Sequence, residues 1–174
     1  ALELPALRPE WVTLSTVLFL LVFCNVPFWS RLLTVQPLSG SSGVGLVALF
    51  AALLGIFNLV LTLLAWPFLL RPLLTVLLVA TAFIAYFMNQ YGVMIDVGMV
   101  RNAMQTDYAE TYDLLTWKMG AYVLLLGALP VWLLWRVPIR WRTPARELLS
   151  KVAVIALSLL VLAGVAFFHY QTFS

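Results

Sequence analysis

Apolar residues gather in long uninterrupted runs, five of which are long enough to cross a lipid bilayer. Runs without a charged residue cover residues 11–29, 44–66, 72–91, 119–135 and 152–168. Each is close to the about 20 residues that a membrane-spanning helix needs, and we place the start of the fifth helix near residue 149. None alternates polar and apolar positions as the strands of a membrane barrel do. The pattern predicts an all-α membrane protein with five transmembrane helices, in which Pro27 and Pro130 bend their helices.

A second pattern follows the third run, in the long segment between the third and fourth spans. Over residues 97–115 apolar side chains recur every three or four positions, as on one side of a helix. These positions are Val100, Met104, Tyr108, Tyr112 and Leu115. The segment is therefore predicted to form an outer amphipathic helix that lies along the membrane surface.

Aromatic residues stand near the ends of the predicted spans, where amphipathic rings favour the headgroup layer. They are Trp11, Trp29, Trp66, Tyr86, Tyr91, Trp117, Trp135, Trp141 and Tyr170. Their positions support the span boundaries given above.

Composition excludes an ordinary soluble protein and favours a single membrane domain, residues 1–174. Hydrophobic residues make up 64% of the chain and charged residues 10%, against about 45–50% and 25% in soluble domains. The formal charge of +3 comes from cations gathered between apolar runs, a distribution that reflects topology rather than nucleic-acid binding. Cys24 is the sole cysteine, so the chain can form neither an internal disulfide nor a thiolate metal cluster.

The cations also predict an orientation. With the amino terminus in the cytoplasm, the cytoplasmic segments hold Arg8, Arg71, Arg136, Arg140, Arg142, Arg146 and Lys151, and the outer segments hold Arg31, Arg101 and Lys118. Because Lys and Arg concentrate on the cytoplasmic side of membrane proteins, we expect five spans to leave the carboxyl terminus on the outer side.

The polar side of the predicted outer helix carries the candidate site. A spacing of four places Asn102, Thr106 and Glu110 in one row. The amide and the hydroxyl can donate hydrogen bonds to phosphate oxygens, while the carboxylate can accept from a primary ammonium group. The row suits a zwitterionic lipid headgroup, although any amphipathic helix has a polar face.

The same region resembles a known family, the lipid A phosphoethanolamine transferases, which include the mobile colistin-resistance enzymes. The resemblance runs through Tyr86–Asp96 and Met99–Leu115, and its most specific part is the Asn-Ala-x-Gln-Thr-Asp-x-Ala-Glu-Thr segment that begins at Asn102. It extends to Asn25–Trp29 and to His169 and Tyr170, and so spans the chain. In that family the donor-headgroup contacts match Asn102, Thr106 and Glu110.

The resemblance implies a membrane anchor and donor-lipid-binding domain in the bacterial inner membrane. The enzymes of this family move phosphoethanolamine from phosphatidylethanolamine to lipid A, which confers polymyxin resistance, through a covalent threonine intermediate in an outer, zinc-dependent catalytic domain. The nucleophilic threonine and the zinc ligands would lie beyond Ser174, so residues 1–174 alone are expected to be inactive. We assign no metal or cofactor to these residues, and we interpret the sole histidine, His169, as an interfacial residue.

Two other functions fit the polytopic pattern. A transporter or channel is disfavoured because the charge-free runs lack the ionisable residues that ion and proton pathways use. A structural subunit without a ligand would make the outer helix a purely surface-lying element. The expected partners of the transferase are phosphatidylethanolamine, lipid A, membrane lipids and its own catalytic domain.

Overall fold

The computed structural model describes residues 6–35, 41–91 and 116–173, and apart from one isolated bridge between Leu7 and Ile139 the regular structure in these ranges is helical. Within them, four helices are long and apolar enough to cross a membrane. They are α3 (Ser41–Leu64), α4 (Leu70–Tyr91), the helix running from Trp117 to Arg136, and α9 (Pro144–Phe173). A bent helix pair makes a fifth span if it is counted as one. The all-helical membrane fold is confirmed; the predicted outer helix, residues 97–115, lies outside the described residues.

The bent pair divides the first predicted span. Helix α1 (Pro9–Phe19) continues through a π-helical turn, η1 (Leu20–Cys24), and α2 (Val26–Val35) leaves it at an angle of 62°. Asn25, between them, has φ −111° and ψ 25°, outside the helical region. Pro27 has no N–H with which to continue the preceding helix, so the chain bends here as its sequence predicts.

The fourth span also contains a π-helical turn. It consists of α7 (Trp117–Tyr122), η2 (Val123–Ala128) and α8 (Leu129–Arg136), and it remains one span through Pro130. The wider turn immediately before Pro130 gives room for a ring that would clash with the carbonyl group four residues earlier. Where the sequence predicts a bend at Pro130, the structure has a local π-helical widening within one span.

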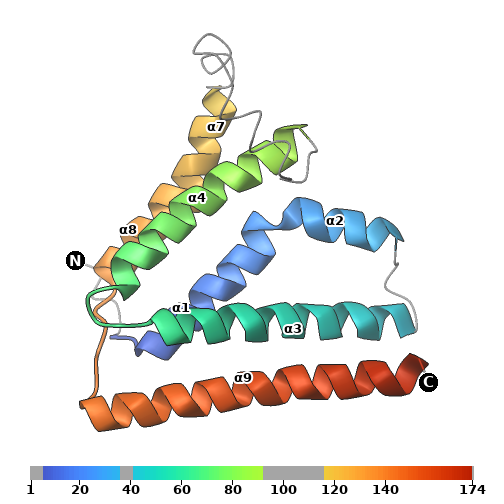
Figure 1. Cartoon of the computed structure of the whole chain (residues 1–174). Helices are drawn as coiled ribbons and strands as arrows, with labels where there is room; N and C mark the ends of the chain where they lie inside the picture. The colour runs from blue at the N-terminus through green and yellow to red at the C-terminus, as the bar shows by residue number, and fades with distance from the viewer. Residues whose placement is uncertain (1–5, 36–40, 92–115, 174) are drawn as a thin grey trace, which may run out of the picture.

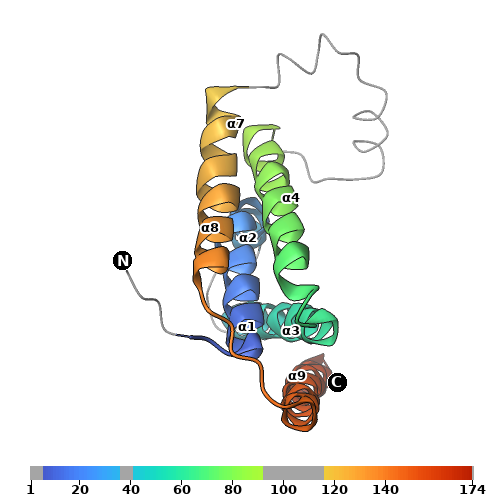
Figure 2. The same ribbon diagram turned by 90° about the vertical axis from the view of Figure 1, so that its left-hand side faces the viewer.

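The helices converge at one end of the molecule and spread apart at the other (Figure 1). The start of α1, the turn from α3 to α4 and the connection from α8 to α9 lie close together, whereas α2, the end of α4 and the start of α7 diverge. We call residues 6–10, 64–71 and 136–151 the converging end. In both views α9 lies at the edge of the molecule, alongside α3 (Figures 1 and 2).

Hydrogen bonds between distant segments hold the converging end together. The backbone of Leu7 donates to Pro138 O at 3.0 Å and accepts from Arg140 N at 2.9 Å. Arg71 Nη2 donates to Val137 O at 3.0 Å. Ser150 Oγ donates to Glu10, and Lys151 Nζ donates to the carbonyl oxygen of Ala65, so α9 is tied to α1 and to the end of α3.

The apolar core is built around α4. Its fully buried residues include Leu70 and Leu74, and they pack with residues of α1, η1, α3 and α8 in one cluster. The other members of that cluster are Val12, Val17, Leu21, Leu61, Ala65, Leu78 and Leu134. Further along α4, Ala82 faces η2 so closely that a Cβ placed on Gly127 would lie 3.3 Å from the Cβ of Ala82. Small residues thus let the third and fourth spans approach each other.

Candidate functional site

The three predicted site residues, Asn102, Thr106 and Glu110, lie outside the described residues. The structure does describe the frame from which their segment departs and to which it returns. That frame is the carboxyl-terminal end of α4 and the amino-terminal end of α7, at the spreading end of the molecule (Figure 1).

A hydrogen bond closes this frame. Tyr86 Oη and Thr116 Oγ1 lie 2.7 Å apart, and either hydroxyl can be the donor. Thr116 is the N-cap of α7, since its side-chain oxygen accepts from Met119 N at 3.3 Å. One hydroxyl therefore fixes the start of α7 and joins it to α4.

The Tyr86 ring strengthens the same junction. It is fully buried and lies edge-on to the ring of Tyr122 in α7, with 5.7 Å between the ring centroids. The buried ring and the hydrogen bond together hold α4 against the start of α7.

One sequence-based interpretation changes at this junction, and one signal in the sequence was missed. Tyr86 was expected at the headgroup layer, but it is buried, whereas Trp11, Trp66 and Trp117 are 57%, 54% and 81% exposed as belt residues should be. The role of Thr116 was missed. A threonine directly before the aromatic start of a helical run is an N-cap signal, and it could have located this end of the frame.

A second feature of the spreading end is the bend between η1 and α2. Breaking a helix leaves carbonyl groups without intrahelical partners. The side chain of Asn25 donates to Leu20 O at 2.9 Å, and the indole of Trp29 donates to Leu21 O at 2.7 Å. The Asn25–Trp29 segment, which carried part of the resemblance, thus supplies the donors that make the bend stable.

The bend is also packed against its neighbours. The Trp29 ring lies 5.6 Å from that of Phe50 in α3, and both η1 and α2 contact α4. Helix α4 therefore supports both the bend and the Tyr86–Thr116 junction. The two features form one connected support at the spreading end.

The described residues of this support contain no group of side chains that could bind a metal ion. Across residues 6–35, 41–91 and 116–173, no three His, Cys, Asp or Glu side chains gather as metal ligands would. The zinc implied by the resemblance has no ligand set among the described residues. The contacts of the described residues at this end join the helices to one another.

The chain is similar to known proteins of one family. A family model described as "Phosphoethanolamine transferase EptA/EptB" matches residues 53–174. The chain is 34% identical to phosphatidylethanolamine transferase Mcr-1 of Escherichia coli, over 97% of this chain and 32% of that protein. It is 31% identical to phosphoethanolamine transferase EptA of Salmonella typhimurium, over 94% of this chain and 30% of that protein.

A solved structure has the same fold. The integral membrane protein lipooligosaccharide phosphoethanolamine transferase A (EptA) from Neisseria meningitidis superimposes with a TM-score of 0.86 and 25% identity, over 97% of this chain and 32% of that one. The chain thus spans about a third of the length of these relatives. Together with its apolar helices, the match makes it a multi-pass membrane protein. Since the family model covers most of its length, the chain belongs to the EptA/EptB family of phosphoethanolamine transferases.

Proposed function

We propose that this chain is the membrane domain of a phosphoethanolamine transferase of the bacterial inner membrane, and that it binds the donor phosphatidylethanolamine. The observation that carries the proposal is the fold match to EptA, whose TM-score of 0.86 extends over 97% of the chain. The frame at α4 and α7 supports it, because the hydrogen bond between Tyr86 and Thr116 joins α4 to the start of α7.

The donor site is proposed on the row Asn102, Thr106 and Glu110. The amide and hydroxyl bind the phosphate of the headgroup, and the carboxylate accepts hydrogen bonds from its ammonium group. Such a row recognises both charges of a zwitterionic headgroup in one orientation. Holding the donor in place beside the acceptor lowers the entropic cost of their reaction.

The remainder of the reaction is assigned to a catalytic domain on the outer side. There a threonine nucleophile and zinc would pass phosphoethanolamine to lipid A, and the product would confer polymyxin resistance. In this arrangement the converging end, which holds Arg8, Arg71 and Arg140, faces the cytoplasm, and the carboxyl terminus faces the periplasm. The transferase reaction distinguishes this proposal from a transporter or a ligand-free structural subunit.

The first test uses the full-length protein in liposomes that contain headgroup-labelled phosphatidylethanolamine and lipid A. Glu110→Ala should raise KM for the donor about fivefold, since an exposed ion pair contributes up to about 1 kcal/mol. The value of kcat should change little, because the carboxylate is proposed to bind rather than react. Asp107→Ala, off the row, is the matched control.

Binding can be measured without turnover. Amide exchange over residues 102–110 should slow when phosphatidylethanolamine is added in detergent, and Glu110→Ala should reduce that protection. An unchanged donor KM together with identical exchange would contradict the donor site. A protein that transfers no label to any lipid acceptor would contradict the transferase itself.

A further inference from the structure

Two buried polar side chains of α3 contain oxygen atoms without a hydrogen-bond partner. Asn58 and Thr62 are 8% and 2% exposed. Within residues 6–35, 41–91 and 116–173, neither Asn58 Oδ1 nor Thr62 Oγ1 makes a hydrogen bond. Most buried polar atoms of folded proteins are paired, because an unpaired one is destabilising. Two such atoms, one helical turn apart, therefore indicate a binding site.

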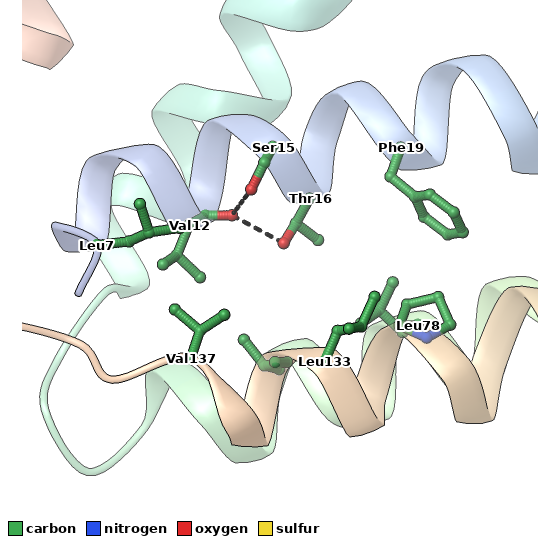
Figure 3. Close-up of a pocket in the computed structure, with 10 residues that line it drawn as sticks. Leu7, Val12, Ser15, Thr16, Phe19, Leu78, Leu133 and Val137 are labelled. Atoms are coloured by element: carbon green, nitrogen blue, oxygen red, sulfur yellow. Dashed lines mark hydrogen bonds between the residues drawn. The ribbon is translucent and has the colours of Figure 1, made fainter. Parts of the chain in front are cut away.

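Thr62 differs from other threonines of the spans in the partner of its hydroxyl group. Thr16 Oγ1 donates to Val12 O at 2.8 Å, as a dashed line of Figure 3 shows. Thr75 and Thr81 likewise donate to the carbonyl oxygen four residues earlier, at 2.8 and 2.6 Å. This bond to its own helix satisfies a threonine in apolar surroundings. Thr62 does not make it, so its hydroxyl is left for another partner.

The unpaired atoms lie on the side of α3 that meets α9. Gly55, Asn58 and Thr62 share one side of the helix, because they are spaced by three and then four residues. A Cβ placed on Gly55 would lie 3.5 Å from Ser158 O of α9, and α9 runs alongside α3 (Figure 1). Ser158 is 5% exposed and is the only buried side chain among those described in α9. We call Asn58, Thr62 and Ser158 the polar seam.

One water molecule suits the polar seam in size and in chemistry. The Cβ atoms of residues four apart on a helix are about 5–6 Å apart, and two hydrogen bonds through one water span about 5.5 Å. Water can donate to Asn58 Oδ1, accept from the Thr62 hydroxyl and give its second proton to the Ser158 hydroxyl. Two to four such partners are usual for a buried water. All three side chains are uncharged, so they offer little to offset the cost of bringing a cation into a span.

We propose that the polar seam binds a water molecule that links α3 to α9 inside the membrane. Thr62 lies two residues before Leu64, where the α3 span ends, so water can enter from the headgroup layer at the converging end. Because apolar burial gives little driving force between helices in lipid, a polar bridge contributes to holding α9 against α3. The site does not depend on the transferase proposal.

Solid-state NMR of the full-length protein in liposomes of deuterated lipid tests the water directly. Magnetisation transferred from water should reach the side chain of Asn58 at least twice as strongly as that of Thr16. The two are matched, since both are 8% exposed and lie six or seven residues from the ends of their spans, but Thr16 is bonded to its own helix. Equal transfer to both, or transfer to neither, would overturn the site. Loss of the Asn58 signal when choline replaces sodium would identify a cation instead of water.

Variants test whether the two side chains of α3 share one ligand. Thr62→Val keeps the shape and removes the hydroxyl, so the unfolding equilibrium constant in mixed micelles should rise about fivefold, the net effect of one hydrogen bond. A fall in that constant would show that the hydroxyl was unpaired and would contradict the proposal. Thr62→Val should also at least halve the water signal at Asn58, whereas Thr16→Val, the matched control, should leave it unchanged.

A double variant completes the test. Asn58→Leu alone should also raise the unfolding constant, because it leaves the Thr62 hydroxyl without its bridge. Asn58→Leu with Thr62→Val should raise it by less than the product of the two single effects, since neither α3 partner of the water is then left unpaired. Effects that simply multiply would show that the two side chains do not share a ligand.

Discussion

Helices α4 and α9 resemble each other in sequence and differ in their place in the bundle. Both are long and apolar, and the most apolar stretch of α9 has the higher mean hydropathy, 2.4 against 1.9 for that of α4. Yet 33% of the most apolar stretch of α4 is buried, against 6% for α9. Helix α4 contacts η1, α2, α7, η2 and α8, whereas α9 packs mainly along α3. Hydropathy therefore indicates that a helix lies in the bilayer but not where it lies in the bundle.

The physical reason is that lipid chains are as apolar as leucine side chains. Burial of apolar surface then gives little driving force between helices, and close packing and polar contacts decide which helices meet. The buried face of α4 contains the small residues Ala82 and Ala85 as well as Leu74. Among the described side chains of α9, only Ser158 is buried.

The largest expected effect on stability comes from comparing Gly127 with Gly164, since each lies within a charge-free apolar run of the sequence. A Cβ at Gly127 would lie 3.3 Å from Ala82, so Gly127→Leu should force η2 away from α4 and destabilise the fold by about 3 kcal/mol. At Gly164 of α9 a Cβ meets nothing within 4 Å, so Gly164→Leu should be neutral or stabilise the helix by a few tenths of a kcal/mol. Unfolding in mixed micelles measures both. Similar losses would show that α4 and α9 are equally packed.

Much of this architecture could be predicted from the pattern of apolar residues. The spans and the bend at Pro27 follow from run length and from the missing N–H of proline. The burial of Tyr86 could not be predicted, because its partners Thr116 and Tyr122 lie 30 or more residues away in sequence. The row Asn102, Thr106 and Glu110 stays a prediction, since spacing fixes which side chains share a helix face but not what that face meets.

Two leucines test the same difference in packing, because truncation of a buried leucine leaves a cavity and truncation of an exposed one does not. Leu74 of α4 is fully buried, while Leu160 of α9 is 70% exposed. Leu74→Ala should cost about 2 kcal/mol, at the low end for buried leucines, because in a bilayer the lost packing contributes and the transfer from water does not. Leu160→Ala exchanges protein–lipid contacts for lipid–lipid contacts and should cost less than about 0.5 kcal/mol. Equal costs in mixed micelles would place Leu160 in a protein interface and refute the peripheral position of α9.

Since α9 has little buried apolar surface, its polar contacts at the converging end should position it. Lys151 Nζ donates to Ala65 O and lies 4.5 Å from the centre of the Trp66 ring. Lys151→Met keeps the aliphatic chain but loses both contacts, and it should cost about 1 kcal/mol because the side chain is partly exposed. Amide exchange should rise in the first turns of α9 and stay unchanged in α4, whereas Lys118→Met, at an exposed position, should alter neither. Recovery by Lys151→Arg would identify the charged contact as the cause, and equal exchange in Lys151→Met and the native protein would show that packing along α3 alone holds α9.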